Sequence, residues 1–459
     1  MPSSGAESAR EDYSPGPAAG QSGSLEGTTA FRWDDPPDPD KYSVCVHCGL
    51  CLEACPTYQE LGIENQSPRG RVYLIRAASE GRLPLDEALI DPVFRCLDCR
   101  ACESVCPSGV QVGTLIEQAR GQVFAARPAQ GWQGFIQRLF LQRIFPRPKR
   151  LRRLARIGRF YQRTGLARLA RSTGVLNLFP PHLREMEAAL PQIPATSSRE
   201  LLPAQVPAQR QRRGRVALVT GCVMDVLFTD TNLATARVLA RNGYEVRVPE
   251  GQVCCGALQV HAGDRETAKA MAKQNIDAFL AEDVDAVIIN AAGCGAAMKE
   301  YGELLRSDPA YREKAERFSR KVKDVAEFLA EVGFDPPKGR VEMTVTYHDA
   351  CHLSHAQGVR QQPRDILASI PGLRVVEMPD SDRCCGSAGI YNLTHPEIAS
   401  PLLDRKMADV PEKAEAIVMG NPGCMMQIRA GVQRTGVPRK VLHTVDILDA
   451  AYQAEEETR

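Results

Sequence analysis

The second half of the chain carries one pattern of hydrophobic and polar positions twice. Short apolar runs, "RVALV" at 215–219 and "MTVTY" at 343–347, have the length of buried strands, and amphipathic stretches such as 231–243 separate runs of this kind. Alternating strands and helices are typical of small α/β units. We therefore predict two repeated α/β domains, at 214–336 and 337–459.

In each repeat a cysteine, an adjacent cysteine pair and a final cysteine follow the predicted strands. The first cysteine precedes the pair by 32 residues in one copy and by 33 in the other, and 39 residues separate the pair from the final cysteine in both. Open α/β sheets bind ligands at the carboxyl ends of their strands, where these thiols fall. The two predicted sets are Cys222, Cys254, Cys255 and Cys294, and Cys351, Cys384, Cys385 and Cys424.

Three uses of these eight thiols are open. Adjacent cysteines are poor partners for a single iron but can serve two irons of a larger cluster, so further metal or iron–sulfur binding is the leading interpretation. A disulfide or catalytic dithiol is the second. Burial as structural residues is the third, although burial alone does not readily explain two matching sets.

Eight more cysteines lie in the first half, in two runs with C-x₂-C-x₂-C-x₃-C-P spacing. In such runs three cysteines from one loop bind a cubane [4Fe–4S] cluster, and the fourth reaches the other cluster. The pattern predicts an α+β ferredoxin-like domain at 37–120 with two clusters and helical surroundings. Two zinc sites are the alternative, but zinc usually takes two ligands per knuckle. The predicted ligands are Cys45, Cys48, Cys51 and Cys106 for the first cluster and Cys96, Cys99, Cys102 and Cys55 for the second.

Between these runs, "SPRGRVYLIRAASEG" predicts a helix with Ser67 as its N-cap and Pro68 at its first position. Its arginines either bring positive charge near the clusters and raise their potentials, or form a solvated helix face. These arginines are Arg69, Arg71 and Arg76.

Three histidines crowd around the first cysteine of the second repeat. They either donate protons or hydrogen bonds to a redox site, or act as ordinary capping and packing residues. They are His348, His352 and His355. No G-x-G-x-x-G follows a strand, so nothing in the sequence indicates a flavin or nicotinamide site, and we do not expect this chain alone to oxidise an alcohol.

Charge is unevenly distributed, although the whole chain has a formal net charge of +1. Residues 118–184 hold 15 Lys and Arg and no acidic residue, which leaves 42 basic against 56 acidic residues elsewhere, a net charge of −14. Leu151, Leu154, Ile157 and Phe160 recur every three residues among arginines. We predict that residues 121–213, a basic helical segment and linker, contact a partner, the chain's own acidic remainder or an anionic membrane surface.

The first 36 residues are small, polar and rich in Gly, Ser and Pro, and predict a disordered tail. They lack the basic start and apolar stretch of a signal peptide, and no apolar run approaches the roughly 18 residues of a membrane helix. We expect a cytoplasmic protein, with peripheral contact on the cytoplasmic face of the inner membrane as the alternative location. In a reducing cytoplasm, sixteen cysteines favour metal or redox chemistry over disulfides.

Specific stretches resemble a known family. They include "CVHCGLCLEACPTYQELG", "CLDCRACESVCPSGV", "TNLATARVLARNG", "GCGAAMKEYG" and "DSDRCCGSAGIYNLTHPEIA". Two ferredoxin-type motifs followed by two such repeats resemble the iron–sulfur subunit of bacterial glycolate oxidase, and each repeat resembles the cysteine-rich CCG domain of heterodisulfide reductase. The resemblance implies an electron-transfer subunit, with FAD on partner subunits that oxidise glycolate to glyoxylate and with quinone or another acceptor downstream.

Alternatives remain beside this interpretation. The same architecture could serve a lactate or glycerol-3-phosphate dehydrogenase, or a thiol/disulfide enzyme. A zinc-stapled nucleic-acid-binding protein is a distant alternative, and the acidic remainder of the chain argues against it. The chain also departs from the CCG pattern, which ends in C-x-x-C. Here "GAA" follows Cys294 and "MMQ" follows Cys424, so each copy has four cysteines, and a simpler cluster or none is open.

Overall fold

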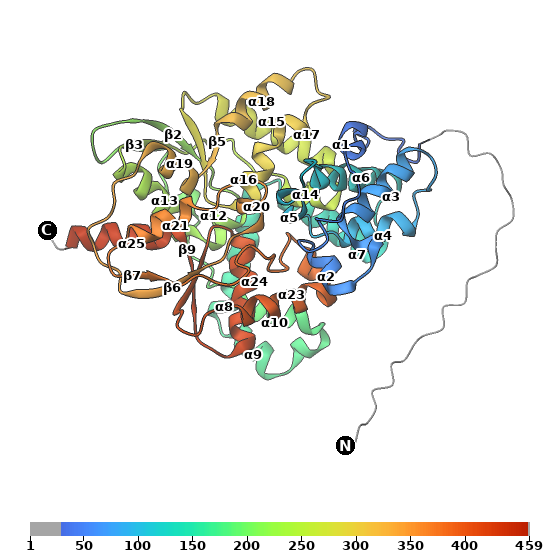
Figure 1. Cartoon of the computed structure of the whole chain (residues 1–459). Coiled ribbons are helices and arrows are strands. Elements are labelled where there is room, and N and C mark those ends of the chain that lie inside the picture. The colour runs from blue at the N-terminus through green and yellow to red at the C-terminus, as the bar shows by residue number, and fades with distance from the viewer. Residues whose placement is uncertain (1–28, 458–459) are drawn as a thin grey trace, which may run out of the picture.

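The computed structural model describes residues 29–457 (Figure 1). Of the predicted tail, residues 1–28 lie outside this range. Part of residues 29–36 packs against the rest of the chain, which corrects the predicted limit: the Ala30 amide donates to the Ala78 carbonyl at 2.9 Å, and Phe31 is buried in the first domain. The predicted disordered tail therefore does not extend to residue 36.

The first domain is helical, and its core is formed by apolar side chains such as Ile75, Leu89 and Leu115. As predicted, Ser67 caps a helix that starts at Pro68, and its hydroxyl accepts from the Gly70 amide at 3.0 Å. The elements are α1 (Pro39–Ser43), α2 (Pro56–Leu61), η1 (Glu64–Gln66), α3 (Pro68–Ser79), α4 (Glu87–Arg95), α5 (Ala101–Ser104) and α6 (Val112–Ala126).

The expected α+β ferredoxin-like arrangement differs from the structure here. Residues 29–204, all of them described, contain no strand. The long connection between Cys55 and Cys96 explains the difference, because it is occupied by α3 and α4, whose apolar faces pack on α6 rather than pairing as a sheet.

The basic segment is helical, as predicted. Its helix α10 packs against α24 of the second repeat, while α8 contacts α12 of the first. The elements are α7 (Gly131–Arg138), the π-helical turn η2 (Leu139–Ile144), α8 (Pro148–Arg163), α9 (Leu166–Ser172), η3 (Val175–Leu178), α10 (Pro181–Ala189) and α11 (Ser198–Leu201).

The first repeat is built on a five-stranded sheet of order β1-β3-β2-β4-β5, parallel except for β1. Its strands are β1 (Gln205–Val206), β2 (Gly214–Leu218), β3 (Tyr244–Arg247), β4 (Ala286–Ile289) and β5 (Val322–Asp324). Its helices are α12 (Val223–Leu227), α13 (Thr229–Arg241), α14 (Ala257–Ala262), α15 (Arg265–Leu280), α16 (Ala292–Lys299), α17 (Tyr301–Leu304), α18 (Arg312–Lys321) and α19 (Val325–Val332).

The second repeat has four parallel strands in the order β7-β6-β8-β9, which matches β3-β2-β4-β5 and confirms the predicted repeat. Its strands are β6 (Met343–Tyr347), β7 (Leu373–Val375), β8 (Ala416–Met419) and β9 (Lys440–His443). Its helices are α20 (Cys351–Ser354), α21 (Gln362–Ala368), α22 (Tyr391–Thr394), α23 (Pro396–Ala408), α24 (Pro422–Thr435) and α25 (Thr444–Glu457).

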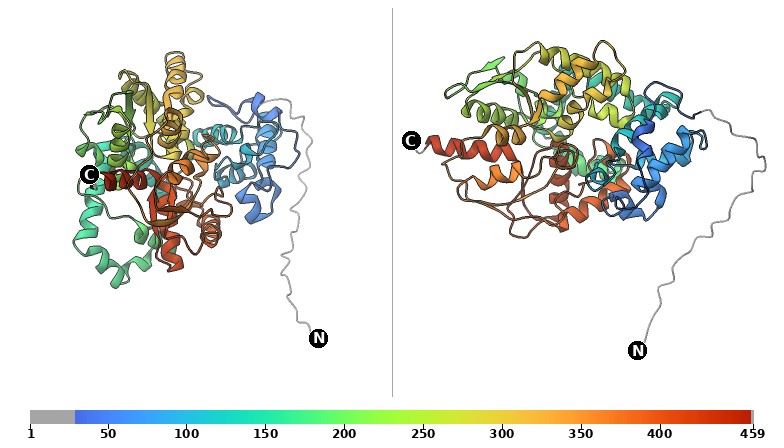
Figure 2. Two further views of the ribbon diagram at one scale, coloured as in Figure 1. Left: turned by 60° about the vertical axis from the view of Figure 1, so that its left-hand side comes forward. Right: turned by 45° about the horizontal axis from the view of Figure 1, so that its top comes forward.

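The two repeats meet at the carboxyl ends of their strands. The Ala292 amide donates to the Gly420 carbonyl at 3.0 Å, and one hydrophobic core contains residues of both sheets. The first domain lies at the end of the molecule opposite α25 in every view (Figures 1 and 2). Among the described helices, none is long and apolar enough to cross a membrane.

Candidate metal centres

The first cysteine group lies in the first domain, around a cavity below the loop that joins α1 to α2. Three of its thiols come from that loop and Cys106 follows α5, so the two runs meet at this point. The Val110 amide donates to Cys106 Sγ at 3.4 Å. The predicted first set, Cys45, Cys48, Cys51 and Cys106, lines this cavity together with Cys102.

The second group lines a neighbouring cavity. Cys55 leaves the first run and joins the thiols of the second, and the Asp98 amide donates to Cys96 Sγ at 3.3 Å. Amide donors aimed at sulfur stabilise thiolate ligands, so this donor set suits a cluster. The predicted second set, Cys55, Cys96, Cys99 and Cys102, is complete at this cavity.

Both cysteine runs adopt the same unusual backbone. His47 and Asp98, each two residues after the first cysteine of its run, have φ of 54° and 52°. Gly49 and Arg100, each directly after the second cysteine, have φ of 87° and 63°. Left-handed conformations are costly for residues other than glycine and persist where the surrounding structure imposes them. The shared strain indicates one geometric demand at both loops, which aiming three thiols at one centre would impose.

The structure separates the three arginines of α3. Arg76 forms a surface ion pair with Glu80, whereas Arg69 pairs with Glu64 and also lines the first cavity, where it donates to the His47 carbonyl at 3.2 Å. Arg71 is 1% exposed and donates to Cys55 Sγ at 3.8 Å, Thr57 Oγ1 at 3.0 Å and the Pro92 carbonyl at 2.6 Å. Positive charge therefore reaches the second cavity through Arg71.

In the first repeat, four thiols form a chain of contacts at the sheet edge. Cys222 contacts Cys254, and Cys255 contacts both Cys254 and Cys294. The hydrogen bond with Cys254 and burial raise the pKa of Cys222 well above its usual value. Without a metal such a cluster would stay protonated, whereas a metal ion would stabilise the thiolates that this packing disfavours.

The second repeat reproduces this chain of contacts. Cys351 begins α20 and contacts Cys384, while Cys385 contacts Cys384 and Cys424. The Asn421 side-chain amide donates to Cys424 Sγ at 3.3 Å. All sixteen cysteines of the protein are free thiols in the structure.

The three histidines around Cys351 have different surroundings. His355 Nδ1 lies 2.8 Å from Ser104 Oγ of the first domain, as expected of a packing residue. His352 stacks edge-on against His261 at 5.4 Å, its Nδ1 lies 3.5 Å from Cys351 Sγ, and burial lowers its pKa to about 3. His348 is 0% exposed and lies beside Cys385 and Cys424.

The second cavity of the first domain adjoins the second repeat. Cys99 belongs to one small hydrophobic cluster with Cys351 and Cys384. Burial raises the pKa of the Cys99 thiol, and charge on Cys351 raises it further. Tyr391 fixes the contact by donating to the Arg95 carbonyl at 2.9 Å. A continuous row of thiols thus runs from the first domain into the second repeat.

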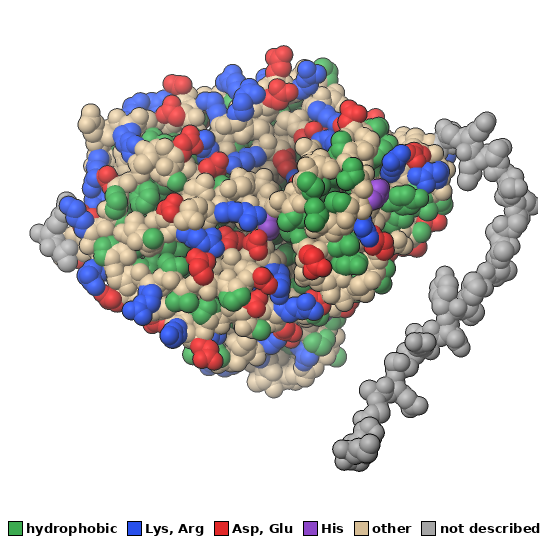
Figure 3. Space-filling view, in the orientation of Figure 1, with side chains coloured by type: hydrophobic (Ala, Val, Ile, Leu, Met, Phe, Trp, Pro, Cys, Tyr) green, Lys and Arg blue, Asp and Glu red, His purple; other side chains and the backbone are tan. Residues whose placement is uncertain are grey.

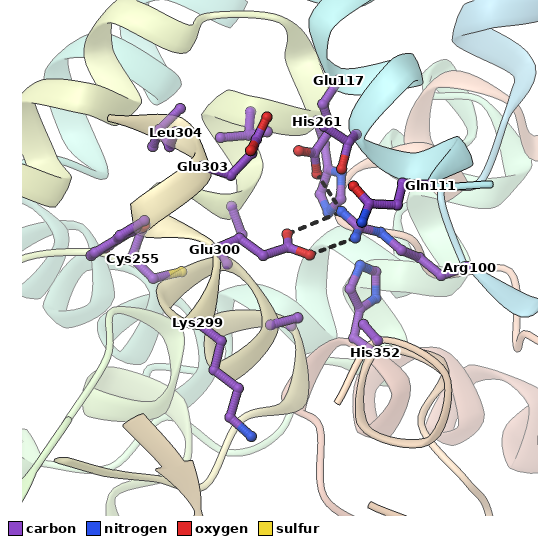
Figure 4. Close-up of a pocket in the computed structure, with 18 of the residues that line it drawn as sticks. Arg100, Gln111, Glu117, Cys255, His261, Lys299, Glu300, Glu303, Leu304 and His352 are labelled. Carbon is purple, nitrogen blue, oxygen red and sulfur yellow. Dashed lines mark hydrogen bonds and ion pairs between the residues drawn. The ribbon is translucent and has the colours of Figure 1, made fainter. Parts of the chain in front are cut away.

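A polar cavity of about 410 Å³ lies where the first domain meets both repeats. Arg100, between two cysteines of the second run, donates from Nη2 to the Glu300 carboxylate at 3.0 Å, and the two side chains face each other in Figure 4. Burial raises the pKa of nearby Glu117 to about 8. Cys255 reaches this cavity, so the first repeat's thiols border polar space.

Reasoning from the sequence missed two of these groups. Arg100 occupies one of the positions between the cysteines of its run. No local sequence signal predicts its contact with Glu300, which lies 200 residues away. His261, whose Nδ1 lies 3.1 Å from the buried Asp98 carboxylate, is likewise brought to the site by tertiary packing alone.

Comparison with known proteins agrees with this geometry. Residues 41–110 match a family described as "4Fe-4S dicluster domain", residues 216–299 and 345–429 match "Cysteine-rich domain", and residues 132–190 match "Glycolate oxidase iron-sulfur subunit, linker region".

Three relatives are similar over most of the chain. A probable glycolate oxidase iron–sulfur subunit of Bacillus subtilis is 42% identical, covering 88% of this chain and 92% of that protein. The glycolate oxidase iron–sulfur subunit of Escherichia coli is 36% identical, covering 90% and 94%. One subunit of the CoM/CoB fumarate reductase of Methanothermobacter marburgensis is 30% identical, covering 93% and 76%.

Fold, cysteine groups and matches together define an iron–sulfur protein with a dicluster domain and two cysteine-rich domains. The chain belongs to the glycolate oxidase iron–sulfur subunit family. Members of this family are subunits of an oxidoreductase complex, and the chain is therefore an electron-transfer component.

Proposed function

We propose that this chain carries electrons from a flavin-bearing partner subunit, which oxidises glycolate to glyoxylate, to an acceptor such as quinone. The observation that supports this most directly is the continuous row of thiols from the first cavity, through Cys99, to Cys351 and Cys384 of the second repeat. The eight N-terminal cysteines would hold two [4Fe–4S] clusters in the predicted sets, and the repeats would hold further redox metal.

Electrons would enter at the first cavity. The loop over it exposes apolar side chains, among them Val46 and Leu50, and Figure 3 shows hydrophobic side chains gathered over the first domain. An exposed apolar surface of this kind is typical of a protein interface. We infer that the flavin-bearing subunit docks here, next to the first cysteine set.

Rapid mixing of the native complex with glycolate tests the proposal. Glycolate should reduce the partner's flavin first and then bleach the visible absorbance of this subunit, before any acceptor is added. The proposal fails if the flavin is reduced and the absorbance of this subunit stays unchanged.

A different donor is the second candidate. Proteins named lactate utilization protein A, from Oceanobacillus iheyensis among others, match about half of this chain at 34% identity or less, and the fumarate reductase relative is named for CoM and CoB. The same conduit could therefore accept electrons from lactate or a thiol/disulfide couple. Offering lactate and glycolate separately to the native complex distinguishes these donors.

Arg71 gives the conduit a direction. Its guanidinium is buried beside Cys55, and among the described residues no carboxylate forms an ion pair with it. A buried charge without a counter-charge is unfavourable by several kcal/mol, and a thiolate-bound cluster would supply that counter-charge. Positive charge favours the reduced form, so the second cluster would have the higher potential and would draw electrons toward the second repeat.

We expect Arg71→Gln to lower the potential of the second cluster by roughly 60 to 130 mV. A hydrogen bond to a charged group contributes about 1.5–3 kcal/mol, and about 1.4 kcal/mol corresponds to ~59 mV for one electron. Redox titration followed by electron paramagnetic resonance measures the shift. Arg76→Gln on the same helix is the matched control: Arg76 is half-buried, is paired with Glu80, lines neither cavity, and should change either potential much less. Equal shifts in both variants would contradict the assignment.

The basic segment favours contact with a membrane. The predicted apolar stripe of α8 turns around the helix: Leu151 is 8% exposed, but Ile157 and Phe160 are 65% and 62% exposed. Arg150 and Arg153 are exposed on the same side and form no ion pair among the described residues. We propose that this face, which presents apolar and basic side chains together, lies on an anionic membrane surface and brings the complex to a lipid-dissolved quinone.

Arg150→Glu combined with Arg153→Glu should weaken binding of the complex to anionic vesicles by more than about tenfold, because each surface charge contributes about 1 kcal/mol. Flotation with and without anionic lipid measures it. Arg317→Glu with Arg320→Glu on α18, which lies at the opposite edge of the molecule from α9 in Figure 1, makes the same charge change and should leave binding unaltered. Binding that ignores lipid charge excludes the membrane role and favours contact with a partner.

A further inference from the structure

The imidazole ring of His348 lies among the thiols of the second repeat. His348 directly follows β6, is fully buried, and neither of its ring nitrogens completes a hydrogen bond. One of its ring nitrogens and the sulfurs of Cys385 and Cys424 lie within 4.8 Å of one another. An imidazole beside two thiols is a frequent donor set for transition metals.

The position of this ring is fixed by the backbone. The His348 amide donates to the Val418 carbonyl at 2.9 Å, which ties the residue to the neighbouring strand β8, and the Asp349 amide donates to the Ser381 carbonyl at 3.0 Å. Leaving a buried polar atom without a partner is unfavourable, so unpaired ring nitrogens aimed at a cysteine set need an explanation. A metal ion between the sulfurs and the ring would use one nitrogen lone pair.

The first repeat has no equivalent. His348 stands three residues before Cys351, and the residue three before Cys222 is the buried Val219. Both repeats otherwise contribute four cysteines at matching positions. At this position the two sites therefore differ by a nitrogen donor, which the second repeat offers and the first does not.

We propose that His348 is a fifth ligand of the metal held by Cys351, Cys384, Cys385 and Cys424. This inference rests on the proposed metal binding of the repeats. His348 would give the second repeat a ligand beyond its four thiols. The first repeat would have its four thiols alone. Replacing thiolate by imidazole raises the potential of iron–sulfur sites, so the nitrogen ligand would raise the potential of the second-repeat site.

Pulsed electron paramagnetic resonance on the anaerobic full-length chain tests the ligand directly. A directly bound imidazole produces a strong ¹⁴N hyperfine coupling that cysteine sulfur cannot give. We expect this coupling in the wild type, its loss in His348→Leu and in His348→Cys, and its retention in the matched variant His352→Leu. The Cys variant keeps a donor in place, and the signals of the first domain report that each variant is folded.

Iron analysis distinguishes a failure of metal binding in the repeats from a failure of the His348 ligand assignment. A wild-type chain with only about eight Fe has metal in the first domain alone, which overturns both the metal-binding repeats and this inference. A chain with more iron but no strong ¹⁴N coupling, or with a coupling that persists in both His348 variants, overturns the ligand assignment and leaves the proposed function standing.

Discussion

Cys48→Ala and Cys99→Ala should each remove about four Fe from the anaerobic protein and stop electron flow to any acceptor. Each cysteine lies in one of the two cavities, and a cubane that loses one of four thiolates loses its framework. The partner's flavin should still be reduced by glycolate, because the chemistry of the substrate takes place there. Metal analysis and acceptor reduction measure the two effects separately.

Val46→Ala provides the control in the same loop. Val46 is exposed between Cys45 and Cys48 and offers no ligand atom. The iron content of Val46→Ala should therefore equal that of the wild type. Full acceptor reduction in Cys48→Ala or Cys99→Ala would remove the corresponding thiol from the conduit, and unchanged iron in either variant would show that the replaced cysteine is not a cluster ligand.

The architecture of the cysteine groups followed from local constraints. The spacing of each run is short, so the backbone between its thiols has few conformations, and Cys55 and Cys106 are placed at the other run's cavity. The repeat was equally accessible, because matching spacings imply matching strands and turns. The ligand sets and domain limits themselves stay predictions that the proposed experiments address.

The position of Arg71 could have been read from helix geometry. At about 100° per residue, Arg71 lies about 200° from Arg69 around α3, on the face of the buried Ile75, whereas Arg76 returns close to Arg69. The same rotation explains α8. Positions three apart drift by about 60° per step, so the stripe that begins at the buried Leu151 ends exposed at Phe160.

Other features depend on tertiary packing, which the sequence does not display. Nothing local marks part of residues 29–36 as packed, because Asp35 is held by Lys269 at 2.6 Å from a distant domain. The helical first domain was also missed, because cysteine spacing fixes the loops and says nothing of the elements between them. His348 was visible in the sequence, but only the structure distinguishes it from His352 and His355.

The order of the sites along the conduit leads to the second large effect. Cys99 shares a hydrophobic cluster with Cys351 and Cys384 of the second repeat, whereas Cys255 of the first repeat borders the polar cavity. We therefore expect Cys384→Ala to stop electron flow beyond the first domain. Glycolate would still bleach the two clusters of that domain, and the metal of the first repeat would stay oxidised.

Cys254→Ala is the matched variant, because Cys254 is the first member of the equivalent pair and is as deeply buried as Cys384. We expect Cys254→Ala to stop electron transfer at the first repeat. The metal of the second repeat would then be reduced, and the acceptor would not. Freeze-quench spectroscopy after mixing with glycolate separates the two patterns. Reduction of the first-repeat metal at the wild-type rate in Cys384→Ala would show that the two repeats act in the reverse order. Acceptor reduction at the wild-type rate in both variants would show that the cysteines of the repeats are structural.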